Sequence, residues 1–227
     1  MNRCGNGWLA LLLLMTAPIL AAAAGSPTSS PSLNPVFNHP ANTAQMKQML
    51  SLVTQRLDGA AALQGQFTQR NHLHGLPLTL RSSGDFLVAR GLGVDWHTLK
   101  PFAAEVVLTP RALIQRSGGT TQTLGADQQP GLAAVARTFD AMFTLDLPQL
   151  AQRFKLYGSP NDTGWVLGLK PRDAALAAHL AAVVVSGSDH PDQVTLYQAG
   201  GDRTEIVFSN VEVVPALSQA QRQRFSP

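Results

Sequence analysis

The sequence predicts a mainly β protein with some α-helix, built around one large antiparallel sheet that carries helices on one face. Short runs of alternating apolar and polar residues recur along the chain, and a glycine pair separates neighbouring runs at two places. No helical pattern of useful length lies between neighbouring runs in the first half of the domain, which favours an antiparallel meander. The chain is 44% hydrophobic and only 14% charged, as expected of a domain that buries much of its surface or keeps an apolar cavity.

Residues 1–24 are predicted to be a removable secretory signal peptide. Arg3 supplies a positive charge, an uninterrupted apolar run follows it, and four consecutive alanines form the small-residue stretch that signal peptidase cleaves. The alternative is a membrane anchor, but the apolar stretch is short and Pro18 interrupts it. The only cysteine, Cys4, lies inside this segment and away from the cleavage site. The mature chain is therefore expected to lack disulfides, cysteine metal sites and a lipid anchor.

Residues 25–41 are predicted to be a disordered linker, because prolines and serines dominate them. One domain is expected to follow, over residues 42–227. The formal net charge of +3 is small and scattered, which excludes the basic footprint of a nucleic-acid-binding protein.

The first element of this domain is predicted to be an amphipathic helix. Asn42 or Thr43 can cap its start, and Gly59 can end it. Its apolar residues follow the helical period and form one stripe, which must rest on another element. They are Met46, Met49, Leu50, Val53 and Leu57.

Alternation predicts strands through most of the remaining chain, with turns at Gly118-Gly119 and Gly200-Gly201. The runs before the first turn cover residues 63–69, 76–80, 84–90, 94–97, 104–109 and 112–116. The runs after it cover residues 120–124, 155–157, 165–169, 183–186, 194–198 and 205–211. Residues 176–181 fit either a helix or a loop.

Two helical patterns interrupt these strands. Residues 130–143 carry an apolar stripe, and residues 147–154 form a shorter pattern. The stripe consists of Leu132, Val135, Phe139, Met142 and Phe143. A closed barrel would fill its interior or hold one ligand, whereas a sheet curved around helices could enclose an apolar cavity without closing.

Several short motifs follow one another in a specific order. The first helix is followed by Phe67-Thr68-Gln69 and then by Gly84-Asp85-Phe86, and Leu169-Lys170-Pro171 comes later. Arg90, Trp96 and Pro101 stand in register with an Arg-Pro-x-x-Phe-Arg-Trp signature and the proline after it. In this order and spacing the chain resembles the LolA family of outer-membrane lipoprotein carriers. Gly91, Val94 and Asp95 depart from the family signature, which indicates a divergent paralogue.

The resemblance implies an incomplete, unclosed β-barrel, formed by one curved antiparallel sheet and covered by a helical lid. It implies a periplasmic carrier that shields the acyl chains of a lipoprotein or lipid in an apolar cavity and moves it from the inner to the outer membrane. The implied partners are an inner-membrane ABC-type extraction complex and an outer-membrane acceptor. The chain is expected to act as a monomer without a cofactor.

Arg90 is the candidate latch of the lid. By resemblance, its guanidinium would donate hydrogen bonds to backbone carbonyls of the lid and keep the empty cavity closed. The alternative is an ordinary surface cation at the end of a strand. The candidate lipid-binding residues are apolar, and each of them could also be ordinary core. They are Phe67, Phe86, Val94, Trp96, Leu132, Val135, Phe139 and Met142.

Catalytic and metal sites are weaker hypotheses. His72 and His74 have no evident third ligand nearby, and Ser188-Asp189-His190 places triad residue types side by side, although real triads are assembled by the fold. No Gly-x-Ser-x-Gly motif and no glycine-rich phosphate loop occurs in the sequence. The chain is therefore expected not to be an enzyme. Two alternatives to a carrier stay open: a module that binds apolar ligands for an envelope lipid assembly system without shuttling, and a small periplasmic hydrolase.

Overall fold

The computed structural model describes residues 34–128, 131–161 and 164–226. The predicted signal peptide lies outside the described residues, as does the first part of the predicted linker. The helices are η1 (Pro35–Asn38), α2 (Thr43–Met49), α3 (Ser51–Leu57), α4 (Leu132–Phe143), α5 (Leu147–Arg153), α6 (Ala174–Ala177) and α7 (Gln219–Gln223). The strands are β1 (Ala62–His72), β2 (Thr79–Ala89), β3 (Gly93–Lys100), β4 (Ala104–Leu108), β5 (Ala112–Ser117), β6 (Thr120–Gly125), β7 (Phe154–Asn161), β8 (Gly164–Pro171), β9 (Leu180–Gly187), β10 (Pro191–Gln198) and β11 (Arg203–Val214).

The strands form one antiparallel sheet of 11 strands, in the order β6-β5-β4-β3-β2-β1-β11-β10-β9-β8-β7. Neighbours in the sheet are also neighbours in sequence except at its centre, where β1 pairs with β11. The two edges, β6 and β7, are consecutive strands that do not pair with each other, and the connection between them carries α4 and α5. The unclosed barrel that the resemblance implied is therefore confirmed.

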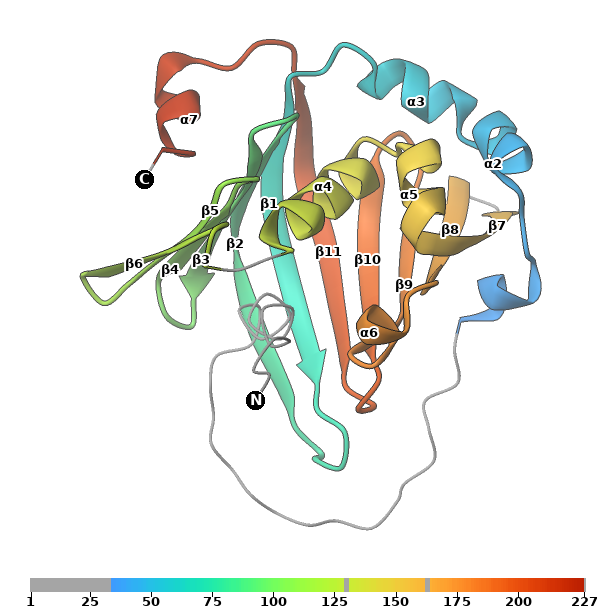
Figure 1. The fold of residues 1–227 in the computed structure, drawn as a ribbon, viewed down its shortest axis with the longest axis horizontal. Coiled ribbons are helices and arrows are strands. Elements are labelled where there is room, and N and C mark those ends of the chain that lie inside the picture. Colours follow the sequence, from blue (N-terminus) through green and yellow to red (C-terminus); the bar gives the residue numbers. More distant parts are fainter. Residues whose placement is uncertain (1–33, 129–130, 162–163, 227) are drawn as a thin grey trace.

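The two faces of the sheet bury different sets of side chains. Along β2, Phe86 and Val88 point into the large cluster on the concave face, whereas Leu87 and Ala89 point into a small cluster on the convex face. Helices α4 and α5 cover the concave face, and α7 lies on the opposite side of the sheet (Figure 1). A register shift between Gln64 and Gln66 interrupts the pairing of β1 with β11 and adds to the twist that curves the sheet.

Local sequence explains the helix starts and the tightest turn. The Asn42 side chain accepts a hydrogen bond from the Gln45 amide at 2.9 Å, and the Gln45 side chain accepts one from the Asn42 amide, which completes a capping box. The predicted first helix is present but divides at Leu50 into α2 and α3. The predicted hairpin turn at Gly118-Gly119 joins β5 to β6, and both glycines have positive φ, as the type I′ turn of a two-residue hairpin requires.

Three segments differ from the sequence-based prediction. Residues 34–41 are folded, because Val36 is buried, Phe37 packs on Tyr157 and Pro40 bridges to Tyr157. The alternating Leu76 and Leu78 lie in the exposed loop before β2, where no neighbouring strand fixes a pleat. Residues 176–181 divide between the end of α6 and the start of β9.

Candidate apolar ligand site

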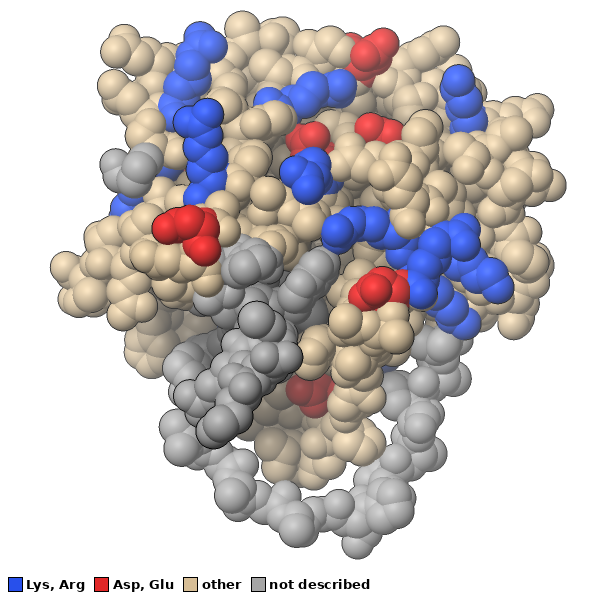
Figure 2. Space-filling view, viewed as in Figure 1, with Lys and Arg blue, Asp and Glu red and all other residues tan. Residues whose placement is uncertain are grey.

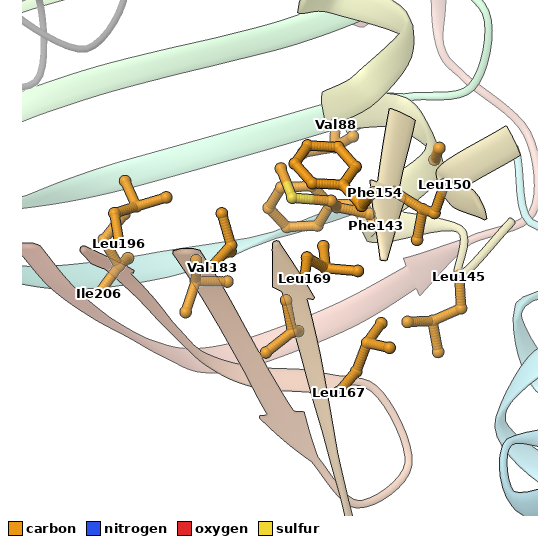
Figure 3. Close-up of a cluster of buried hydrophobic side chains, with 14 of the residues drawn as sticks. Val88, Phe143, Leu145, Leu150, Phe154, Leu167, Leu169, Val183, Leu196 and Ile206 are labelled. Atoms are coloured by element: carbon orange, nitrogen blue, oxygen red, sulfur yellow. The ribbon is translucent and has the colours of Figure 1, made fainter. Parts of the chain in front are cut away.

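An entirely apolar cavity lies between α4 and the concave face of the sheet. Its volume is about 20 Å³, which is close to the space that one water molecule needs and far below that of an acyl chain. The lining residues are Trp96, Phe139, Met142, Phe143, Val185, Pro191, Val194, Leu196, Ile206 and Phe208. Leu169, Val183 and Leu196 project from the sheet on the side where Phe143 lies (Figure 3). In this conformation the lid helix is packed down on the site.

Aromatic rings line this cavity and also pack directly behind its wall. The Trp96 ring stacks on Phe67 with centroids 3.9 Å apart, and Phe208 contacts both Phe86 at 4.9 Å and Phe143 at 5.5 Å. Strand register explains this arrangement, since Phe86 lies opposite Trp96 and Phe67 lies opposite Phe208. The four adjacent strands β3, β2, β1 and β11 therefore bring these rings to one place beneath α4.

The structure separates the proposed lipid-binding residues into two groups. Phe67, Phe86, Val94, Trp96 and Met142 belong to the large concave cluster, and Phe139 packs against it. Of these, Trp96, Phe139 and Met142 line the cavity itself. The other group, Leu132 and Val135, belongs to a separate cluster beneath the first turns of α4, with Leu108 and Leu113.

Some lining residues were absent from the sequence-based set. Phe143 was recognised on the helical stripe, and Leu196, Ile206 and Phe208 lie in strands that alternation identified. Their role depends on the pairing of β1 with β11, which brings distant parts of the chain together. Period-2 alternation identifies buried positions in a strand but does not show which of them face a helix.

Arg90 lies at the rim of the sheet, just after β2. Its Nη2 donates a hydrogen bond to the Leu57 carbonyl oxygen at 2.9 Å, at the last residue of α3. A helix end leaves carbonyls without intrahelical partners, so a guanidinium is a suitable donor there. Arg90 therefore contacts a backbone carbonyl at the end of a helix, and that helix is α3.

The same rim reaches α4 through Asp140. The Gly91 amide donates to Asp140 Oδ1 at 3.4 Å. Burial raises the pKa of the Asp140 carboxyl, while this hydrogen bond and the nearby charge of Arg90 lower it. A second small cavity of about 20 Å³ lies here, and its lining includes Leu57, Arg90, Asp140 and Phe143. Because Phe143 lines both cavities, its ring separates the rim from the apolar cavity.

Asp95, a departure from the family signature, has no contact with the cavity. It points to the convex face, where its fully buried carboxylate pairs with the Arg224 guanidinium just after α7. Burial is the main cause that raises the pKa of Asp95 to about 6, and Arg224 partly offsets it. Leu217 and Phe225 pack beside this pair on Leu87, Val107 and Ile114. Residues 215–226 thus pack on the convex face of the sheet, which the sequence-based prediction did not anticipate.

The candidate catalytic residues are not arranged as a nucleophile with its base. The Ser188 hydroxyl donates to Asp192 Oδ2 at 3.3 Å, and His190 Nδ1 contacts Asp192 Oδ1 at 2.8 Å. Asp189 pairs instead with Arg56 of α3. His72 contacts Glu205 at 3.5 Å. Among the described residues, no group of three or more His, Cys, Asp or Glu side chains could hold a metal ion.

On the face that carries α4 and α5, uncharged areas separate most of the charged side chains, and a group of Lys and Arg side chains lies to the right of the centre of the view (Figure 2). In the part of the chain that the structure describes, no helix combines the length and apolarity needed to cross a membrane.

Comparisons with known proteins give one family and several similar folds. A family model described as outer membrane lipoprotein carrier protein LolA matches residues 58–223. The LolA superfamily protein NE2245 from Nitrosomonas europaea is 13% identical with a TM-score of 0.42, over 79% of this chain and 97% of that one. MucB of Pseudomonas aeruginosa, in its complex with MucA, is 20% identical with a TM-score of 0.41, over 75% and 60%. The lipoprotein LppX of Mycobacterium tuberculosis is 9% identical with a TM-score of 0.41, over 75% and 96%. No curated protein matches the chain.

Proposed function

The chain belongs to the LolA family of outer membrane lipoprotein carrier proteins, and we propose that it carries the acyl chains of a lipoprotein or lipid through the periplasm, from the inner to the outer membrane. The observation that carries this proposal is the apolar cavity between α4 and the concave face of the sheet. Helix α4 covers this cavity, and the barrel beneath it is not closed. In this proposal Arg90 is the latch, and the aromatic wall around Trp96 receives the cargo.

The energetics of acyl chains explain why such a carrier is needed. Exposure to water costs about 0.8 kcal/mol per methylene, so a lipid with on the order of 30 methylenes faces roughly 25 kcal/mol outside a membrane. A carrier that recovered all of this energy could not release its cargo, because non-covalent affinities level off near about −18 to −21 kcal/mol. A cavity that is closed when empty limits the affinity, since binding must first displace the lid.

The packing of α4 and α5 suggests how the cavity opens. These helices lie in the connection between the edge strands β6 and β7, which do not pair with each other, so they can move without breaking a pair of strands. Movement of α4 would withdraw Phe139, Met142 and Phe143 from the cavity and join the space beneath the rim to the space beneath the helix. The cargo would replace the apolar contacts that α4 loses.

Native mass spectrometry of the chain purified from the periplasm tests this function. We expect adducts with the mass of an acylated lipid or lipoprotein, and transfer of that adduct to outer-membrane vesicles. Adducts that bind but never transfer would indicate a module that holds apolar ligands without shuttling. The proposed partners are an inner-membrane ABC-type complex that loads the chain and an outer-membrane receptor that unloads it. Loading and unloading assays with the two membranes would identify them.

A protein that carries no lipid and hydrolyses esters would contradict the proposal. That activity would have to disappear on substitution of Ser188 or His190, the residues of the hydrolase hypothesis.

A further inference from the structure

Strand β6 has a bare edge. It pairs with β5 on one side, and the order of strands in the described sheet gives it no neighbour on the other. Its first four residues are exposed, and Figure 1 shows it at the outer limit of the sheet. An edge of this kind presents unpaired backbone N–H and C=O groups to any extended chain.

The features that usually protect an edge are missing from β6. Its sequence, Thr-Thr-Gln-Thr-Leu-Gly, contains no charged residue and no proline, and its six pairs with β5 run without a register shift. Its threonines also favour an extended backbone.

The opposite edge, β7, is covered by the chain itself. The Ala41 amide donates to the Leu156 carbonyl at 3.2 Å, and the Gly158 amide donates to the His39 carbonyl at 3.0 Å. Among the described residues, the chain therefore blocks the β7 edge with its own backbone and leaves the β6 edge available.

The register shows which groups of β6 are available. At one end of the hairpin, Ser117 of β5 pairs with Thr120 of β6 across the two-glycine turn. At the other end, the Ala126 amide donates a hydrogen bond to the Arg111 carbonyl at 2.8 Å. Because bonded and non-bonded pairs alternate in an antiparallel ladder, the N–H and C=O groups of Thr121 and Thr123 point away from β5. The carboxylate of Asp127 lies beside Gly125, so the accessible edge is centred on Thr121–Thr123.

A second copy of the chain does not suit this edge. Pairing of two six-residue strands buries far less than the roughly 800 Å² per partner of a stable interface. A peptide that is already tethered nearby needs no such area, because the tether raises its effective concentration to the order of millimolar.

The cavity lies within reach of such a tethered peptide. Leu124 of β6 packs on the cluster that holds Leu132, at the start of α4. Met142, ten residues further along α4, lines the cavity. That part of a helix is about 15 Å long, a distance that about five extended residues cover.

We propose that the free edge of β6 binds, as an added strand, the polypeptide segment that follows the acylated residue of a lipoprotein. This inference rests on the proposed function and narrows it, because it makes the cargo a lipoprotein and not a free lipid. The acyl chains occupy the apolar cavity, and main-chain hydrogen bonds to Thr121 and Thr123 hold the peptide without reading its sequence.

The test compares three probes on the full chain, by displacement of a fluorescent fatty acid. The first probe is a dipalmitoylated-cysteine lipopeptide with ten uncharged residues. The second is the same lipopeptide with every other amide N-methylated, in two versions that together cover both registers of pairing. The third is dipalmitoylglycerol. We expect the unmodified lipopeptide to bind about tenfold more tightly than the methylated one. Equal affinities for the two lipopeptides overturn the inference and leave the proposed function intact.

Thr123→Pro provides the matching change in the protein, because it removes an outward N–H without removing a ladder bond to β5. We expect it to lose the preference for the unmodified lipopeptide and to bind dipalmitoylglycerol as the wild type does. Thr123→Ala keeps the N–H and should keep the preference. A Thr123→Pro protein that binds dipalmitoylglycerol normally and retains the preference overturns the inference. Failure of all three probes to bind the wild type overturns the proposed function and this inference with it.

Discussion

The Nη2 of Arg90 lies 2.9 Å from the carbonyl oxygen of Leu57 and joins the rim of the sheet to the last residue of α3. The next residue, Gly91, contacts Asp140 of α4. The turn between β2 and β3 therefore contacts two helices, α3 and α4. In the proposed function these contacts belong to the closed conformation, so they would favour the empty state over the loaded one.

Arg90→Leu is expected to load cargo and to release it slowly. A hydrogen bond to a charged group contributes about 1.5–3 kcal/mol, so its loss from the closed state should slow release about tenfold or more. The measurement is the rate of transfer of a labelled lipopeptide from the preloaded protein to vesicles. Transfer at the wild-type rate would show that Arg90 is an ordinary surface cation.

Arg56→Gln is the matched control for this change. Arg56 also lies near the end of α3, and it pairs with Asp189 at 2.5 Å, but both side chains are more than 60% exposed. Exposed ion pairs contribute little to stability. We expect release from this variant at the wild-type rate.

Phe143→Ala is expected to enlarge the empty cavity. The Phe143 ring lines both small cavities, so its removal joins them, and truncation of a buried phenylalanine typically destabilises a protein by about 3–5 kcal/mol. Binding of an apolar fluorophore should increase while the melting temperature falls. Leu87→Ala is the control, because Leu87 is equally buried but lies on the convex face. It should lower the melting temperature without increasing fluorophore binding, and an equal increase in both variants would contradict the assignment.

The ionisation of Asp95 should lower the free energy of unfolding as the pH rises from about 4 to above 6. Its pKa is about 6 in the folded protein and 3.8 for an ordinary aspartate. The folded chain therefore binds a proton that the unfolded chain has released, and folding is favoured at the acid end of this window. The difference corresponds to at most about 3 kcal/mol.

Asp95→Asn isolates this contribution. Asparagine does not ionise, so the difference in unfolding free energy between variant and wild type should grow with pH across this window and stay constant above it. Chemical denaturation at pH 4, 5, 6, 7 and 8 measures the difference. His97 and Glu105 also act on Asp95, but they are present in both proteins. A difference that does not depend on pH would show that Asp95 titrates normally.

Gly84→Ala is expected to destabilise the sheet strongly. A Cβ at Gly84 would lie 1.9 Å from the carbonyl oxygen of His97 on the neighbouring strand, and a backbone atom cannot move aside cheaply. At Gly200 a Cβ would meet no atom within 4 Å. The melting temperature of Gly84→Ala should fall far below that of Gly200→Ala, and equal values would contradict this reading of the β2–β3 contact.

The order of elements was largely predictable, because alternation and helical periodicity reflect burial directly. The capped helix from Thr43, the turn at Gly118-Gly119 and the apolar stripe of α4 all follow from local sequence. Residues 34–41 were misjudged because their prolines indicate a linker, whereas their fold depends on contacts with β7.

The candidate site was predictable only in part. Motif resemblance identified Arg90 and Trp96, but the carbonyl that Arg90 contacts depends on where α3 ends. The role of Asp95 depends on Arg224, which lies far away in the sequence and reaches Asp95 only because the segment after β11 packs on the convex face of the sheet. No local pattern shows such a pairing, since neither residue has an unusual neighbour in the sequence.

Photo-crosslinking from a single position tests most directly whether acyl chains bind beneath α4. A diazirine amino acid of similar size would replace Met142, which lines the cavity, and in a second protein Val207, which is 46% exposed on the other face of β11. After irradiation in living cells, mass spectrometry should find acylated adducts at position 142 and none at position 207. Adducts of equal yield at both positions, or none at position 142, would contradict a carrier that holds its cargo in this cavity.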